Sequence, residues 1–144
     1  MKKVAISACL LGGLCRYDGK TKIHNSVITA FEDWEIIPFC PEAPLFGTPR
    51  ERISVFYVNG QNRIITDETD KDVTELLIDE TKRFILAHPD LDMIVLKSKS
   101  PSCGRGTTPI LNDKREVIAL GDGVSAALFK ENYSHLEIKD ETGF

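Results

Sequence analysis

The sequence predicts a single α/β domain over residues 1–144, Rossmann-like, in which a mainly parallel sheet is flanked by helices and carries an inserted β-hairpin. The first observation is that short, apolar, β-rich segments alternate with segments whose apolar residues recur at helical spacing. The second is an Asn-Gly pair between two strand-like segments, which is a strong signal for a hairpin turn. The third is a length of 144 residues, which suits one domain with its own core.

The N-terminal part of the chain is expected to alternate between strand, helix and strand. Residues 2–7 (KKVAIS) form a β-rich run that gives way to a loop with Cys9 and a glycine pair. Residues 26–33 are expected to form a short helix, and residues 34–39 (WEIIPF) a second buried strand. That second strand ends at Cys40, so each of these strands is closely followed by a cysteine.

The middle of the chain predicts a hairpin and a long helix. Residues 53–58 and 63–66 flank the tetrapeptide Asn-Gly-Gln-Asn, which favours a tight turn because Asn and Gly tolerate positive φ. The Thr-x-x-Asp pattern over 69–72 resembles a capping box and predicts a helix that runs to about His88, where Pro89 helps to end it. The apolar face of that helix is expected to comprise Val73, Leu76, Leu77, Phe84 and Ile85.

The C-terminal part supplies two more strand-like segments and a helix. Residues 92–97 (DMIVLK) are expected to form a third core strand, with Cys103 in the loop that follows. Residues 116–120 (EVIAL) are expected to form a fourth, and residues 124–132 (VSAALFKEN) the last helix. In open α/β sheets, ligands bind beyond the carboxyl ends of the strands. The three cysteines that follow predicted strands could therefore meet in one crevice.

Composition and charge exclude several classes of protein. A net charge of −4 gives no general reason to expect nucleic acid as a partner, although a local basic patch could bind a small anion. The apolar runs are too short for a membrane span, and the N-terminal MKKVAISACLLGG lacks the cleavage pattern of a signal peptide. We therefore expect a cytoplasmic protein with no membrane partner, in which cysteines are usually reduced. The sequence leaves the oligomeric state open.

Four cysteines in such a protein call for an explanation other than disulfides, and several explanations remain open. Each thiol taken alone could be a small buried apolar residue, which is the preferred interpretation of Cys15 in the loop GGLCRYDG. A structural zinc site normally uses paired ligands such as Cys-x-x-Cys, which this chain lacks. A cysteine–histidine catalytic pair is possible in principle. The candidate histidines stand in no recognisable motif; they are His24, His88 and His135.

An iron–sulfur cluster fits the scattered cysteines better, because clusters accept thiolates from distant loops. Three ligands would leave one iron of a cubane open, and an open iron is a Lewis acid that can bind a substrate atom. The basic residues of the segment KSKSPSCGRG favour a thiolate at Cys103. Glycines beside the cysteines are expected to let backbone N–H groups approach the cluster sulfides. These glycines are Gly12, Gly13, Gly104 and Gly106.

Three motifs together resemble a bacterial family once known only as a domain of unknown function, the thiouracil desulfurase family. They are ISACLLGGLCRYDG, FCPEAPLFGTPR and KSKSPSCGRG, and the segment GDGVSAALFKEN extends the resemblance over nearly the whole chain. The resemblance implies a single α/β domain that holds a 4Fe-4S cluster on Cys9, Cys40 and Cys103. It implies that the open iron takes the sulfur of a thiolated pyrimidine such as 2-thiouracil. It also implies Glu42 as a catalytic acid or base and Ser98 as a catalytic serine.

Hydrolysis is the simplest chemistry for these residues. Water attacks the thiocarbonyl carbon, and iron makes the departing sulfur a better leaving group. Glu42 is placed to activate the water or to protonate the ring, and Ser98 to orient the water or bind the substrate. Without the resemblance, Glu42 is interpreted as a surface or helix-start carboxylate and Ser98 as an ordinary loop serine. Arg50 is equally compatible with an anion contact in the site and with a structural salt bridge.

Two departures from the family pattern leave the substrate open. Family members tend to carry Gly-Leu before the Pro-Arg of the second motif, where this chain reads PLFGTPR, and the loop after PSCGRG is short. Two other function classes also remain. One is a cysteine- or zinc-dependent hydrolase that uses Cys103, and the other is a non-enzymatic module that holds a metal or a cluster.

Overall fold

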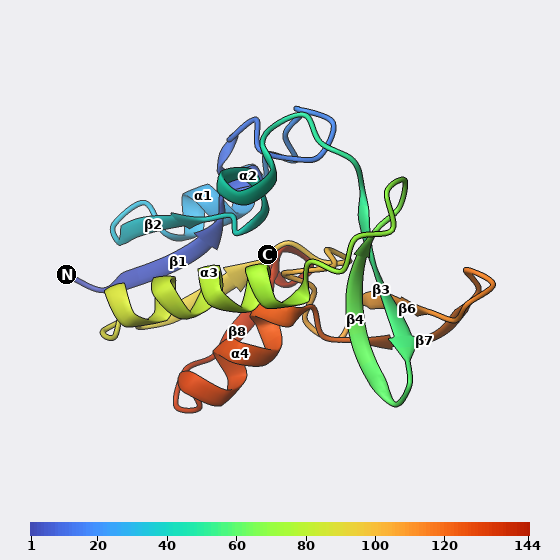
Figure 1. The fold of residues 1–144 in the computed structure, drawn as a ribbon. Helices are drawn as coiled ribbons and strands as arrows, with labels where there is room; N and C mark the ends of the chain where they lie inside the picture. Colours follow the sequence, from blue (N-terminus) through green and yellow to red (C-terminus); the bar gives the residue numbers. More distant parts are fainter.

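The computed structural model describes all residues 1–144 and contains two four-stranded sheets (Figure 1). The first sheet has the strand order β2-β1-β5-β8, and all of its neighbouring strands are parallel. Its strands are β1 (Lys3–Ser7), β2 (Glu35–Phe39), β5 (Met93–Leu96) and β8 (Ile138–Asp140). The predicted parallel sheet with flanking helices is therefore confirmed.

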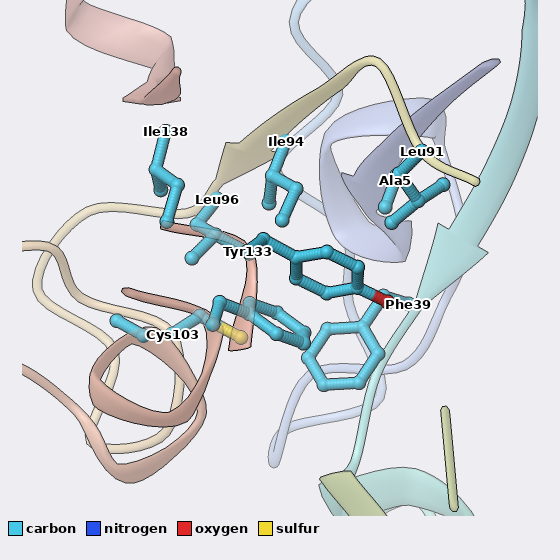
Figure 2. Packing of buried hydrophobic residues seen from close by; sticks show 10 residues of the cluster. Ala5, Phe39, Leu91, Ile94, Leu96, Cys103, Tyr133 and Ile138 are labelled. Atoms are coloured by element: carbon cyan, nitrogen blue, oxygen red, sulfur yellow. The ribbon is translucent and has the colours of Figure 1, made fainter. Parts of the chain in front are cut away.

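Helices cover both faces of the first sheet. Successive side chains of a strand point to opposite faces, so each face contributes its own set of side chains to a buried cluster. On one face, Ala5 and Ile94 belong to a buried cluster with Tyr133 (Figure 2). The same cluster includes Phe129 of α4 (Val124–Asn132), and Phe84 of α3 (Thr74–Ala87) packs against it. On the other face, Ile6 packs in a second cluster that includes Val27 of α1 (Asn25–Ala30). None of the helices combines the length and apolar character that a membrane crossing requires.

The second sheet has the strand order β4-β3-β6-β7 and contains the predicted hairpin. Its strands are β3 (Ile53–Val58), β4 (Gln61–Thr66), β6 (Thr108–Leu111) and β7 (Val117–Gly121). The turn between β3 and β4 has positive φ at Asn59 (51°) and Gly60 (82°), as a type I′ hairpin turn requires. The hairpin is thus part of a separate mixed sheet, in which β6 runs parallel to β3 and antiparallel to β7.

The prediction that residues 116–120 form a fourth core strand is wrong. This segment is β7, at the edge of the second sheet, where Val117, Ile118 and Leu120 are 59%, 53% and 64% exposed. The fourth position in the parallel sheet belongs to β8, which the sequence pattern does not indicate. An apolar run does not reveal whether both of its faces are buried, and β8 is too short to show alternation.

The start of α3 also differs from the prediction. The helix begins at Thr74, and Asp72 Oδ1 accepts hydrogen bonds from the Thr74 backbone N (3.0 Å) and Oγ1 (2.7 Å). Thr69 instead contacts Thr66 Oγ1, so no capping box forms between residues 69 and 72. Leu76 is 51% exposed and lies outside the buried face.

Candidate functional site

A cavity of about 400 Å³ lies at the carboxyl ends of three adjacent strands of the first sheet. Cys9 lies in the short 3-10 helix η1 (Ala8–Leu11) that directly follows β1. Cys40 is the first residue after β2, and Cys103 lies in the turn that follows β5. All three line the cavity, and so does Cys15 from the loop after η1. The structure therefore brings the three thiols that follow predicted strands to one place, together with a fourth.

The thiols are close enough to alter one another's chemistry. A hydrogen bond with the Cys15 thiol lowers the pKa of Cys9 below its usual value. A hydrogen bond with Cys15, together with burial, raises the pKa of Cys40. Burial raises the pKa of Cys103 to about 12. The raised pKa values favour neutral thiols at Cys40 and Cys103 in the free protein, so the expectation that the basic residues of the loop favour a thiolate at Cys103 is wrong, because burial has the larger effect.

The Cys103 turn is fixed by hydrogen bonds within the segment 100–104 and to the start of α4. The Cys103 backbone N donates to Ser100 Oγ (3.0 Å), and the Gly104 N donates to the Ser100 carbonyl (2.9 Å). The Ser102 carbonyl accepts from the Ser125 N (2.8 Å) at the beginning of α4. A Cβ on Gly123 would lie 2.5 Å from the carbonyl carbon of Ser102, so this close approach requires glycine.

Glu42 is the first residue of α2 (Glu42–Phe46) and lines the same cavity. Its Oε2 accepts a hydrogen bond from Ser102 Oγ (2.6 Å), and Ser102 directly precedes Cys103. Its Oε1 lies 3.4 Å from Arg50 Nη2, and the two side chains are only 13% and 5% exposed. Glu42 is thus a nearly buried carboxylate beside the thiols, and the interpretation as a surface carboxylate does not describe it.

The Arg50 guanidinium forms an ion pair with Glu42 and also donates hydrogen bonds to the residues just after α2. Its Nη1 donates to the Gly47 carbonyl (3.0 Å) and to Thr48 Oγ1 (3.3 Å). Its Nε is the one buried side-chain nitrogen or oxygen in the structure that has no hydrogen-bond partner. Both open interpretations of Arg50 therefore have a basis, since it forms an ion pair with Glu42 and is also one of the residues that line the cavity.

Ser98 lines the cavity two residues beyond β5 and is nearly buried. Its Oγ donates to Glu141 Oε2 (2.9 Å), and its backbone N donates to Glu141 Oε1 (2.7 Å). Lys97 Nζ lies 3.0 Å from Glu141 Oε2. The sequence does not single out Glu141, because it follows the unpredicted strand β8.

Other predicted features of the site behave differently. All four glycine amides predicted to face a cluster donate hydrogen bonds to protein groups instead. Gly12 N donates to the Cys9 carbonyl, and Gly13 N to the Ala8 carbonyl. Gly104 N donates to the Ser100 carbonyl, and Gly106 N to the Asp122 carboxylate. The expectation that these amides face a cluster is therefore wrong. None of the three histidines lines the cavity. Arg16 and Tyr17, two polar residues that follow Cys15, do line it.

The donor set fits an iron–sulfur cluster. Four thiols line the cavity, and sulfur is the donor that such clusters use. No group of three or more His, Cys, Asp or Glu side chains is arranged to hold a single metal ion. A cubane distributes its thiolates over separate irons, so its ligands need not converge on one point.

Comparisons with known proteins identify the family of this chain. Residues 4–141 match the model of the family described as 2-thiouracil desulfurase. The chain is 30% identical over 137 residues to the uncharacterised protein YbbK of Bacillus subtilis (strain 168), and the match covers 89% of each chain. It is 29% identical to a solved [4Fe-4S]-dependent thiouracil desulfidase, TudS, with a TM-score of 0.75 over 100% of this chain and 93% of that one. The predicted resemblance and the predicted enzyme class are confirmed, and the chain belongs to the 2-thiouracil desulfurase family.

Proposed function

We propose that this protein is a [4Fe-4S]-dependent desulfurase that replaces the sulfur of a thiolated pyrimidine, such as 2-thiouracil, by oxygen. Family membership and the likeness to TudS support the reaction class. The single observation that carries the proposal is the meeting of Cys9, Cys40 and Cys103 at one cavity beyond three parallel strands. These three residues would hold the cluster and leave one iron without a protein ligand.

The reaction is a hydrolysis with no net change in oxidation state. A C=S group and water give a C=O group and hydrogen sulfide. The cluster, when bound, supplies an iron that binds the substrate sulfur and stabilises its charge as it leaves. A water must attack the carbon from a direction that leaves the sulfur on the cysteine side of the cavity. The base that activates this water therefore has to lie in the cavity next to the cysteines, but away from the side on which the sulfur is bound.

Glu42 meets that requirement and acts as the base. Its carboxylate lies against Arg50, and Ser102 Oγ donates to Oε2, so the side chain has a fixed position. Its free lone pairs can accept the proton of the attacking water. Once protonated, Glu42 can return that proton to the sulfur or to the ring. Ser98 lines the same cavity just beyond β5, where it would contact the substrate.

The experiment is anaerobic purification, quantification of iron and sulfide, and assay of 2-thiouracil for release of uracil and sulfide. We expect about four irons and four sulfides per chain, as a cubane contains, and equal amounts of uracil and sulfide. A colourless protein with stoichiometric zinc would overturn the proposal in favour of a zinc hydrolase. A clustered protein that turns over no thiolated base would favour a module without catalytic activity.

Glu42→Gln tests the base. We expect this variant to keep its iron and to lose turnover by roughly 100-fold or more, within the range for a general base. Glu131→Gln, an exposed residue on α4, is the matched control and should match the unsubstituted protein. Normal turnover in the Glu42 variant would remove Glu42 from the mechanism without affecting the assignment of the cluster.

A further inference from the structure

Glu141 directly follows β8, just as the site residues follow the other strands of the first sheet. It is the first residue of the 3-10 helix η2 (Glu141–Gly143), directly after β8, and β8 lies beside β5. Its side chain is 12% exposed, and its carboxylate contacts Lys97 and Ser98 just beyond the end of β5. A nearly buried carboxylate in this place needs an explanation, because burial of a charge is costly.

The hydrogen bonds around Glu141 determine the direction in which Ser98 can bond. A serine hydroxyl has one proton to donate and two lone pairs to accept with. The Ser98 proton is directed to Glu141 Oε2, at 2.9 Å. An ionised carboxylate has no proton to give back. Lys97 Nζ, at 3.0 Å from the same Oε2, stabilises the charged form.

The pKa of Glu141 supports this assignment. Burial alone would raise it, but hydrogen bonds from the Ser98 backbone, Lys97 and the Ser98 hydroxyl hold the pKa below its usual value. Glu141 is therefore ionised at neutral pH. Lys97 Nζ also lies 3.4 Å from Ser98 Oγ, as a further donor. With its proton committed, Ser98 Oγ can offer the cavity only a lone pair.

We propose that Glu141 is a positioning residue that fixes Ser98 Oγ as a hydrogen-bond acceptor, and that Ser98 thereby recognises an N–H of the substrate ring beside the thiocarbonyl. This inference rests on the proposed function, for which 2-thiouracil is the model substrate, and 2-thiouracil carries N–H groups on both sides of its C=S carbon. A ring with a methyl group on that nitrogen has no proton to give. A site built to bond a polar group rejects analogues that lack it, because its own group is left unpaired.

The test compares 2-thiouracil with its N1-methyl and N3-methyl derivatives. For the unsubstituted protein, we expect kcat/KM for one of the two derivatives to fall by roughly 10-fold or more. In Glu141→Gln, the amide donates to Ser98 Oγ, so the serine proton is free to turn into the cavity. The ratio between 2-thiouracil and that derivative should then shrink to within about threefold. A purely steric rejection of the methyl group would survive the substitution and would overturn the proposal.

Two further measurements separate positioning from general damage. In Ser98→Ala, the ratio should already be lost, and adding Glu141→Gln should change it no further, because the two residues act as one unit. Ser98→Ala with an unchanged ratio would overturn the proposal even if Glu141→Gln does not fold. Glu137→Gln is the control in the same segment, since Glu137 is exposed and contacts Lys139. It should leave the ratio unchanged.

A readout independent of turnover is calorimetric binding of uracil and its N-methyl derivatives to the iron-loaded protein. We expect the same preference for the free N–H and its loss in Glu141→Gln, with iron content unchanged. If the unsubstituted protein desulfurates 2-thiouracil but treats all three compounds alike, this inference fails and the proposed function stands. If it neither binds nor desulfurates them, both fail.

Discussion

The two sheets of this protein contrast in burial and in the chemistry that they carry. The two central strands of the first sheet are buried on both faces, and residues 4–6 of β1 and 94–96 of β5 are all completely inaccessible to solvent. The second sheet ends in β7, where three large apolar side chains are exposed. Every predicted ligand and catalytic residue follows a strand of the first sheet. The second sheet contributes Ile53 of β3, with Arg52 just before it, to the edge of the cavity.

This difference indicates why the site residues follow buried strands. A strand packed on both faces cannot shift without disturbing two core clusters, so the residues at its end hold their positions. An edge strand with an exposed face moves at little cost. Substitutions at buried positions and at the cysteine loops should therefore have much larger effects on stability and on the cluster than substitutions on the exposed edge strand β7, and the predictions below test that difference.

The largest effect is expected for Cys103→Ser, which alters a loop of the first sheet. A serine hydroxyl is a poor replacement for a thiolate in binding iron, so we expect the variant to lose its cluster. Iron and sulfide content after anaerobic reconstitution provide the measurement. Cys15→Ser is the matched control, because it makes the same change in the same cavity and should keep the cluster. A reversal, with Cys15 required and Cys103 dispensable, would show that the ligand assignment is wrong.

The next largest effect is expected in the core that supports the site. Phe129 on α4 is fully buried, and its ring centroid lies 5.0 Å from that of Phe39, directly before Cys40. Phe129→Ala should lower the free energy of unfolding by about 3–5 kcal/mol, from lost burial and the resulting cavity. Urea unfolding followed by circular dichroism provides the measurement. Leu86→Ala, at a position 82% exposed on α3, should change it by less than about 0.5 kcal/mol.

The sequence was sufficient to predict the parts of the site that follow strongly apolar strands. Cys9, Cys40 and Cys103 each follow a strand-like run, and the carboxyl ends of parallel strands share one edge of a sheet. Glu141 could not be found in this way, because the three residues of β8 are too few to show an alternating pattern. The place of Cys15 depends on the path of a loop, which local sequence does not determine.

The fold shows the same division between what local patterns specify and what they do not. The hairpin was predictable because Asn59 and Gly60 favour one turn geometry. The separation into two sheets was not predictable, because an apolar run such as that of β7 is compatible with a core strand and with an exposed edge strand. Tertiary packing decides between them, and it involves residues far apart in the chain.

A smaller effect, at the junction between the two sheets, is expected for Gly123→Ala. Gly123 links β7 to α4, and an added Cβ would lie 2.6 Å from the Ser102 carbonyl oxygen. We expect a loss of about 1–3 kcal/mol in the free energy of unfolding, which is typical of overpacking. Turnover should also fall, because Ser102 carries the hydrogen bond to Glu42.

Gly143→Ala is the matched control for this substitution, since its Cβ would meet nothing within 4 Å. It should leave both stability and turnover unchanged. If Gly123→Ala were equally harmless, the Cys103 turn would have to be more adaptable than its hydrogen bonds to α4 indicate.

The smallest effect is expected in β7. Leu120 pairs with Pro109 of β6 but is 64% exposed, so Leu120→Ala removes little buried surface and should change the free energy of unfolding by less than about 0.5 kcal/mol. Ile110→Ala, on the adjacent strand β6 and 7% exposed, should lower it by about 2–5 kcal/mol. Both variants should keep their iron, because neither side chain lines the cavity. A loss of more than about 1 kcal/mol or of iron in Leu120→Ala would mean that the edge strand supports the cluster loops after all, and the contrast between the two sheets would no longer hold.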